Sequence, residues 1–256
     1  MYRIATFMVV MMFVATTFVI SQEEEDESLP PPKRAGSVKI GGAVGFTQSL
    51  LFVNVDPINQ VLRAQNLAEF SKDGLLMLGG QGYAYVILVP NLRIGYQSMG
   101  GRLKSKTLYQ ASNTVREVEL AVGYSAGTVD YTIPSLARID VTAGIMLGGG
   151  EMDLKFARSY GHGQDWTSTW AEFGGDQAAE EYSGKISGSF FVYQPSVNLE
   201  FAVFRWLGIR AGVSYLGMAG GDWKRDDKYD VYGVPDDVSG KGWMIHSGIF
   251  LGTFVF

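Results

Sequence analysis

The stretch SVNLEFAVFRWLGIRAGVSYLG, residues 196–217, decides the fold of this chain. On either side of its centre, apolar side chains take every second position, and small or charged side chains take most positions between them. A period of two is typical of half-buried β-strands. A tight turn at Phe204–Trp206 then places Glu200 opposite Arg210 on the face that lacks the aliphatic side chains, where opposite charges attract. The stretch therefore predicts an antiparallel hairpin with one apolar face and one face of small residues and paired charges.

The same alternation recurs along the chain and predicts eight strands. Their expected ranges are about 37–53, 75–89, 92–100, 114–130, 137–157, 184–203, 207–221 and 241–256. Long connections are expected at about 54–74, 101–113, 158–183 and 222–240, with short turns between the other strands. An even strand number, with short turns on one side and long loops on the other, is the plan of a membrane barrel. We therefore predict an all-β fold, an eight-stranded antiparallel transmembrane β-barrel. A soluble eight-stranded barrel or sandwich, with the apolar face inward, is the alternative.

The polar faces of the predicted strands combine glycine with charges of both signs. The charged residues expected to face the lumen are Lys39, Arg93, Glu117, Glu119, Arg138, Asp140, Glu200 and Arg210. Eight strands enclose little more space than side chains fill, so these groups predict a charge-paired, plugged lumen. A narrow channel for small or apolar solutes is the alternative, although an open pore more often has an uncompensated ring of charge.

Two further patterns assign faces to strands. A turn at Pro90–Asn91 would place Tyr83 and Tyr85 on the apolar outer face, and Gly80, Gly82, Ala84 and Arg93 on the lumen face. In the segment 116–125, the apolar face holds Val118, Leu120, Val122 and Tyr124, and the face with Glu117 and Glu119 is expected inside. The apolar faces are thus expected to meet lipid.

The chain ends in FLGTFVF, with Phe250, Phe254 and Phe256 in a strand pattern. Together with the eight-strand pattern and the N-terminal segment, this ending resembles small outer-membrane barrels of the OmpA-transmembrane-domain, OmpX and OmpW type. The resemblance implies that these three phenylalanines form the signal read by the barrel-assembly machinery. The last strand is apolar on both faces, so its pattern leaves its orientation open.

The N-terminal segment predicts export. Residues 1–21 have one early cation and an apolar run, which is typical of a cleaved signal peptide; an uncleaved anchor helix is the alternative. Residues 22–36 are acidic and proline-rich and predict a solvated periplasmic tether before the barrel at 37–256. The chain has no cysteine, which excludes disulfides and thiolate metal sites, and its net charge of −5 argues against a nucleic-acid partner.

The long loops supply the remaining candidates. Asp56, Pro57 and Gly74 predict a helix at about 57–70 in the first loop, bounded by an N-cap and a stop signal. Trp166, Trp170 and Phe173 have helical spacing in the third loop and are a possible contact for a partner or lipid. The aspartates of 222–240 lack EF-hand spacing, so no metal or other cofactor is expected.

Catalysis is weakly supported. The chain has two histidines, His162 and His246, and His246 and its neighbour Ser247 would point to opposite faces of a strand. We therefore expect no enzyme, but an outer-membrane protein of a Gram-negative-type bacterium that acts structurally, in adhesion, or by binding an unknown extracellular ligand through its loops. Its other expected partners are outer-membrane lipid and the assembly machinery.

Overall fold

The computed structural model describes residues 41–109, 114–136, 138–159 and 182–253. The predicted signal peptide and tether lie outside these ranges. So do the candidate residues Lys39, His162, Trp166, Trp170, Phe173, Phe254 and Phe256.

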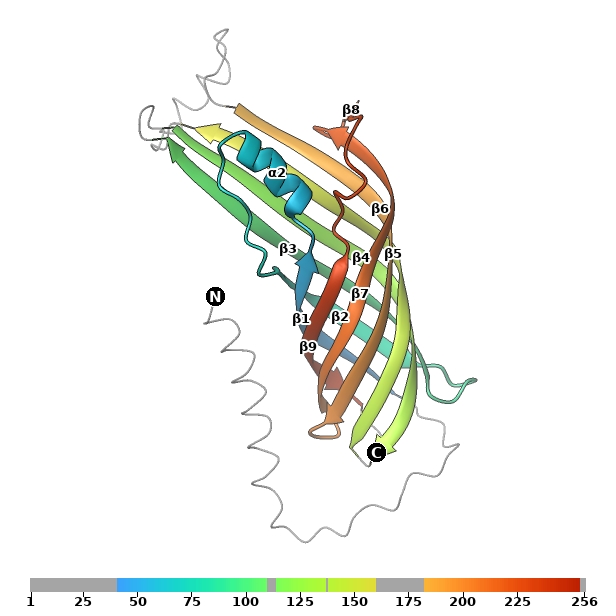
Figure 1. Ribbon diagram of the computed structural model, residues 1–256. Coiled ribbons are helices and arrows are strands. Elements are labelled where there is room, and N and C mark those ends of the chain that lie inside the picture. Colours follow the sequence, from blue (N-terminus) through green and yellow to red (C-terminus); the bar gives the residue numbers. More distant parts are fainter. Residues whose placement is uncertain (1–40, 110–113, 137, 160–181, 254–256) are drawn as a thin grey trace, which may run out of the picture. The chain divides into compact units, whose positions relative to one another are not determined.

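Eight long strands form a closed antiparallel barrel (Figure 1). They are β1 (Gly42–Val53), β2 (Leu75–Tyr85), β3 (Leu92–Tyr109), β4 (Thr114–Leu136), β5 (Ile139–Ser159), β6 (Tyr182–Ala202), β7 (Leu207–Arg225) and β9 (Gly242–Gly252). Each strand pairs with the next along the chain, and β9 pairs with both β7 and β1, which closes the ring. The two-residue strand β8 (Tyr229–Asp230) pairs only with the end of β7. The predicted fold class is confirmed.

The hairpin that decides the fold forms as predicted. Glu200 of β6 lies opposite Arg210 of β7 in the ladder. The turn between the strands is closed by the Phe204 amide, which donates to the Leu207 carbonyl over 3.0 Å. Val197 and Val213 point outward and are each about half exposed (51%). The face assignment for this hairpin is therefore right.

The β2–β3 turn differs from the prediction. β2 ends at Tyr85, and a loop of six residues, 86–91, replaces the expected turn at Pro90–Asn91. Asn91 takes a left-handed conformation there (φ 64°), which asparagine tolerates better than most residues. In the resulting register Tyr85 pairs with Arg93, so the tyrosines of β2 share the inner face with Arg93. The prediction that Tyr83 faces outward is wrong.

The strands on one side of the barrel are longer than the others. β3 to β7 have 18 to 23 residues each, whereas β1, β2 and β9 have 11 or 12. The long loop expected at 101–113 is wrong over 101–109, because β3 continues to Tyr109 and pairs with β4 throughout. Charged side chains face outward on this extension, so its sequence lacks the apolar alternation that predicts a strand.

The helix α2 (Asp56–Ala64) lies in the first long loop, as predicted, but is shorter than expected. Its N-cap is Val55 and not Asp56, while the proline falls in the first turn. Asn59 fixes the chain after the helix, because its amide donates to the Phe70 carbonyl (3.0 Å) and accepts from the Phe70 amide (2.8 Å). Within the described residues, no helix has the length and apolar character needed to cross a membrane.

The half of the interior nearer the long loops is an apolar core. Side chains from the barrel strands form it together with side chains from α2 and its following loop. Its members include Leu51, Val55, Ile58, Leu62, Phe70, Leu75, Met77, Met99, Leu120, Met152, Val192, Leu216 and Met244. α2 and the loop before β9 therefore cover this end of the lumen with packed side chains.

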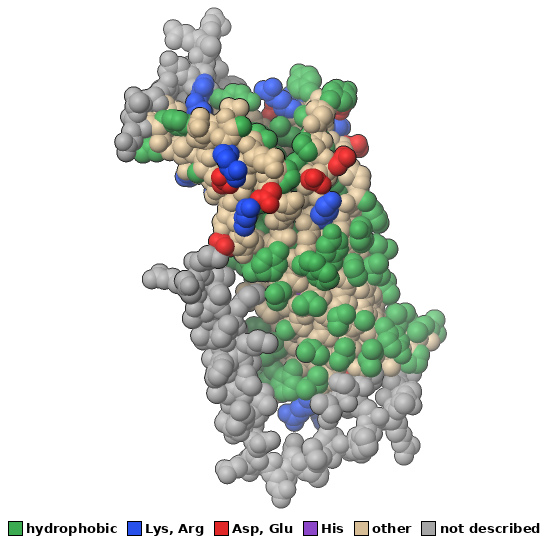
Figure 2. All heavy atoms as spheres, in the orientation of Figure 1, with side chains coloured by type: hydrophobic (Ala, Val, Ile, Leu, Met, Phe, Trp, Pro, Cys, Tyr) green, Lys and Arg blue, Asp and Glu red, His purple; other side chains and the backbone are tan. Residues whose placement is uncertain are grey.

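The outer wall of the barrel is apolar over a band of each strand. Figure 2 shows one face, on which hydrophobic side chains cover the wall and most charged ones gather nearer α2 and β8. The outward positions of the band lie within 44–52, 76–84, 92–100, 121–133, 139–149, 189–201, 207–217 and 243–251. None of these outward positions, all of them described, is Asp, Glu, Lys or Arg.

Candidate functional site in the barrel interior

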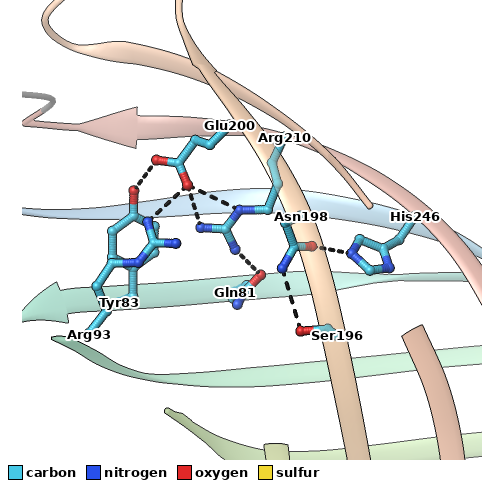
Figure 3. A network of polar contacts seen from close by, with 8 residues as sticks. All are labelled: Gln81, Tyr83, Arg93, Ser196, Asn198, Glu200, Arg210 and His246. Carbon is cyan, nitrogen blue, oxygen red and sulfur yellow. Dashed lines mark hydrogen bonds and ion pairs between the residues drawn. The ribbon is translucent and has the colours of Figure 1, made fainter. Parts of the chain in front are cut away.

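Glu200 is the centre of a buried polar layer in the half of the lumen nearer the short turns (Figure 3). Its carboxylate accepts hydrogen bonds from Arg93 Nη1 (2.9 Å), Arg210 Nη2 (2.9 Å) and the Tyr83 hydroxyl (2.7 Å). Arg93, Glu200 and Arg210 therefore lie in the lumen where the sequence predicts them. The tyrosine was missed, because its face depends on the unexpected β2–β3 turn.

Aromatic rings and amides complete the surroundings of the two guanidinium groups. Arg93 lies 4.2 Å from the centre of the Tyr83 ring, and Arg210 lies 4.3 Å from that of Phe250. Arg210 also donates to Gln81 Oε1 over 2.8 Å. Cation–π contacts of this kind strengthen when they are shielded from water.

The layer contains buried charges of both signs. Arg93 is fully buried, and Glu200 and Arg210 are almost so. A second buried carboxylate, Asp130, lies opposite Arg93 in the β3–β4 ladder. Both guanidinium groups form ion pairs with Glu200, and buried charges are retained at tolerable cost only when they are paired in this way. Asp140 is half-buried beside Glu200 in the β5–β6 ladder and extends the layer.

A second set of polar contacts adjoins the first. His246 Nε2 contacts Asn198 Oδ1, and its Nδ1 lies 3.4 Å from Ser214 Oγ. A serine that contacts a histidine, which in turn contacts an asparagine, can form a nucleophilic site. Here, however, the neighbouring cavity has about 20 Å³ for the centre of a water-sized sphere, which is enough for one or two waters. The arrangement holds β6, β7 and β9 together and has no space for an acyl substrate.

Glu117 and Glu119 do not face the lumen, so this prediction is wrong. They lie on the outer face of β4, where Lys104 Nζ approaches both (2.9 and 3.0 Å) and Lys106 Nζ approaches Glu117 (2.8 Å). Hydrogen bonds from Lys106 and Lys104 lower the pKa of Glu117, and the hydrogen bond from Lys104 lowers that of Glu119.

The reason is that the polarity of the two faces reverses along β4. Val118, Leu120 and Val122 point inward into the apolar core, because α2 fills the lumen at this level. The outer face at the same level lies beyond the apolar band and contains charged side chains. The search for an apolar outer face therefore assigned this half of β4 to the wrong side.

Arg138 and Phe250, two other residues singled out from the sequence, lie in different parts of the barrel. Arg138 is exposed at the start of β5, at the rim of the barrel and outside the buried layer. Phe250 is fully buried and points inward, which settles the orientation of the last strand. Trp243, Ile245 and Leu251 consequently face outward. The role of Phe250 in assembly stays a prediction.

Several members of the polar layer lay outside the sequence prediction. Gln81, Asp130, Asn198 and His246 are polar residues at single positions of apolar-looking strands. Asp130 had a usable signal, since it alternates with the outward Val129 and Tyr131. In the described ranges, no group of three His, Asp or Glu residues could hold a metal ion.

No protein-family model matches the chain, and no curated protein matches it. Among solved structures, a major outer membrane protein from Thermus thermophilus is 9% identical, with a TM-score of 0.43, covering 83% of this chain and 98% of that chain. Ail, the attachment invasion locus protein of Yersinia pestis, is 11% identical, with a TM-score of 0.39, covering 83% and 97%. The N-terminal β-barrel domain of Pseudomonas aeruginosa OprF is 6% identical, with a TM-score of 0.36, covering 83% and 96%. The chain is thus distantly similar in fold to these three structures.

Proposed function

We propose that this chain is an outer-membrane β-barrel with a closed lumen, which acts as a structural, adhesive or ligand-binding surface protein. The observation that carries the proposal is the uncharged apolar band around the outer wall. Soluble monomers rarely expose apolar patches of more than a few hundred Å². A bilayer would cover the band, while the closed ladder satisfies the backbone polar groups that lipid cannot.

Aromatic pairs at both edges of the band support the same assignment. Phe204 and Trp206 stack at the short-turn edge, with ring centres 5.6 Å apart. Tyr215 and Trp243 meet edge-to-face at the long-loop edge, with centres 5.4 Å apart. Aromatic girdles of this kind flank the apolar band of transmembrane barrels.

The packing of the interior favours a closed lumen over a channel. The apolar core and α2 fill one half, and the ion-paired layer around Glu200 links the walls in the other half. A conducting pore would need a continuous wet path, and the polar cavity holds only one or two waters. The same packing argues against catalysis by Ser214 and His246.

Fractionation of cells tests the membrane assignment. The full-length protein is expected with outer membranes and, in an unheated detergent gel, migrates differently from the boiled protein. Recovery in the soluble periplasmic fraction would overturn the proposal and return the fold to the class of soluble barrels.

Planar-bilayer recording tests the closed lumen. The wild-type protein is expected to give no steady conductance, since no wet path crosses the apolar core. Steady single-channel currents that change in the variant Arg210→Ala would favour a narrow channel instead. Glu151→Gln, an exposed outer-face change, serves as the control.

A further inference from the structure

A second, larger cavity lies at the long-loop end of the barrel. It occupies about 350 Å³ between the ends of β6 and β7 and the loop that precedes β9. Phe190 and Trp223 form one wall, with their rings edge-to-face and their centres 5.6 Å apart. The volume falls within the range of small-molecule sites, and an aromatic wall is a common part of them.

A bulge in β7 places peptide groups at this cavity. Ser189 pairs with Asp222, and Phe191 pairs with Ala219, so Gly220 and Gly221 have no partner in the β6–β7 ladder. Gly220 has a positive φ of 75°, and a Cβ atom there would meet nothing within 4 Å. Bulges re-aim strands beside binding sites, and glycine lets a ligand approach the backbone. The bulge therefore places two glycines in the lining of the cavity, where a bound molecule can come close to the backbone.

The wall formed by the loop before β9 mixes polar with apolar side chains, the latter being Val234, Pro235 and Val238, and has no net charge. Ser239 is 6% exposed, and its hydroxyl oxygen is buried with no partner among the described residues. Leaving a buried hydroxyl without a partner costs about 1–3 kcal/mol, and a ligand that hydrogen-bonds to Ser239 would recover this cost. Asp236 and Lys241 add one acid and one base to the lining.

We propose that this cavity binds a neutral saccharide of one or two rings. A pyranose has C–H faces that pack on aromatic rings and hydroxyls that both donate and accept hydrogen bonds, which matches these two walls. A purely apolar ligand would leave the buried Ser239 hydroxyl without a partner. Asp236 and Lys241 together add no net charge, so the lining favours neither an anion nor a cation. The assignment rests on the proposed surface-binding function and names its ligand class.

Saturation-transfer NMR on the purified full chain tests the proposal. The barrel is held in a detergent without a sugar headgroup and is offered maltose, N,N′-diacetylchitobiose, glucuronate or p-cresol. Saturation transfer is expected to one or both neutral saccharides, and at least tenfold less of it in Trp223→Ala and Ser239→Leu. The matched control Trp206→Ala, at the other end of the barrel, is expected to behave as wild type. Heat-modifiable migration checks that each variant is folded.

Three results would overturn the proposal: no transfer to either saccharide, equal transfer in folded Trp223→Ala, or a preference for p-cresol or glucuronate. The assay does not depend on where the protein resides in the cell. Saccharide binding by a protein recovered in the soluble fraction would therefore contradict the membrane assignment alone. Recovery in the outer membrane without saccharide binding would contradict the cavity proposal alone.

Discussion

At the scale of single residues, Glu200 forms hydrogen bonds to three other strands within the polar layer drawn in Figure 3. It lies on β6 and accepts hydrogen bonds from β2, β3 and β7. Glu200 is next to Arg210 because β6 and β7 are paired strands, whereas it reaches Tyr83 and Arg93 across the lumen. The residue thus acts as a tie across the interior.

Replacing Glu200 by Gln is expected to destabilise the barrel by about 3 kcal/mol or more, because two buried guanidinium groups lose their shared carboxylate. Urea unfolding of the protein in micelles measures the difference. Glu151→Gln, on the exposed outer face, is the matched control and should stay within about 0.5 kcal/mol of wild type. A Glu200→Gln midpoint equal to that of the control would show that the tie contributes little.

The Glu200–Arg210 pair could be predicted from the sequence because a tight turn fixes the register of neighbouring strands. Contacts across the lumen had no such signal. Tyr83 and His246 reach the layer through the curvature of the closed barrel, which depends on the register of all eight pairs together. One unexpected turn, at 86–91, was enough to reverse the faces of β2.

At the scale of elements, the outer face of β3 and β4 beyond the apolar band is held by ion pairs. Lys104 bridges Glu117 and Glu119, and Lys155 approaches Glu119 from β5 (3.4 Å). These groups are partly exposed, so each pair contributes at most about 1 kcal/mol. The pairs explain why β3 continues as a strand where apolar alternation stops.

Acid is expected to weaken these ion pairs on the outer face of β3 and β4. Lys104 lowers the pKa of Glu119 in the folded protein. The stabilisation is therefore present above the ordinary glutamate pKa and is lost as the pH falls through the lower, folded value. Lys104→Gln should flatten the fall in the urea midpoint between about pH 5 and pH 2. Lys228→Gln, an exposed change elsewhere, should leave that pH dependence as in wild type.

The position of α2 over the end of the lumen depends on the side-chain amide of Asn59. Asn59→Ala removes both hydrogen bonds to the Phe70 backbone, and a loss of about 2 kcal/mol is expected locally. Hydrogen exchange at the Phe70 amide and proteolysis within 54–74 should both accelerate, while the barrel stays folded. Gln60→Ala, one residue on and exposed, is the control. Unchanged exchange in Asn59→Ala would mean that packing of Ile58 and Leu62 suffices to hold α2.

The strands themselves were largely predictable, and their faces only in part. β5, β6 and β7 keep one polarity across the apolar band, so a period of two located them and oriented them. β4 reverses polarity where the lumen becomes a packed core, and a sequence window cannot tell an apolar face against α2 from one against lipid. The existence of the helix was predictable from its proline, but the helix ends before Asn66, which has a left-handed conformation (φ 54°), and not near the predicted stop at Gly74.

At the scale of the whole molecule, the apolar band is the feature that separates a membrane barrel from a soluble one. Val197 and Leu108 both face outward and are similarly exposed, at 51% and 58%. Val197 lies near the middle of the band on β6, whereas Leu108 lies beyond the ion pairs of Lys104 on β3. Next to a bilayer, Val197 would face lipid, whereas Leu108 would still face water.

Val197→Arg is therefore expected to destabilise the lipid-reconstituted barrel by about 2–4 kcal/mol, the cost of a lipid-facing arginine near the bilayer midplane. Leu108→Arg should change stability by less than about 0.5 kcal/mol, since water already surrounds that position. Urea unfolding in phospholipid vesicles measures both. Equal effects of the two substitutions would contradict membrane insertion. A large effect at Val197 alone, in phospholipid vesicles, would support a band that lies against lipid.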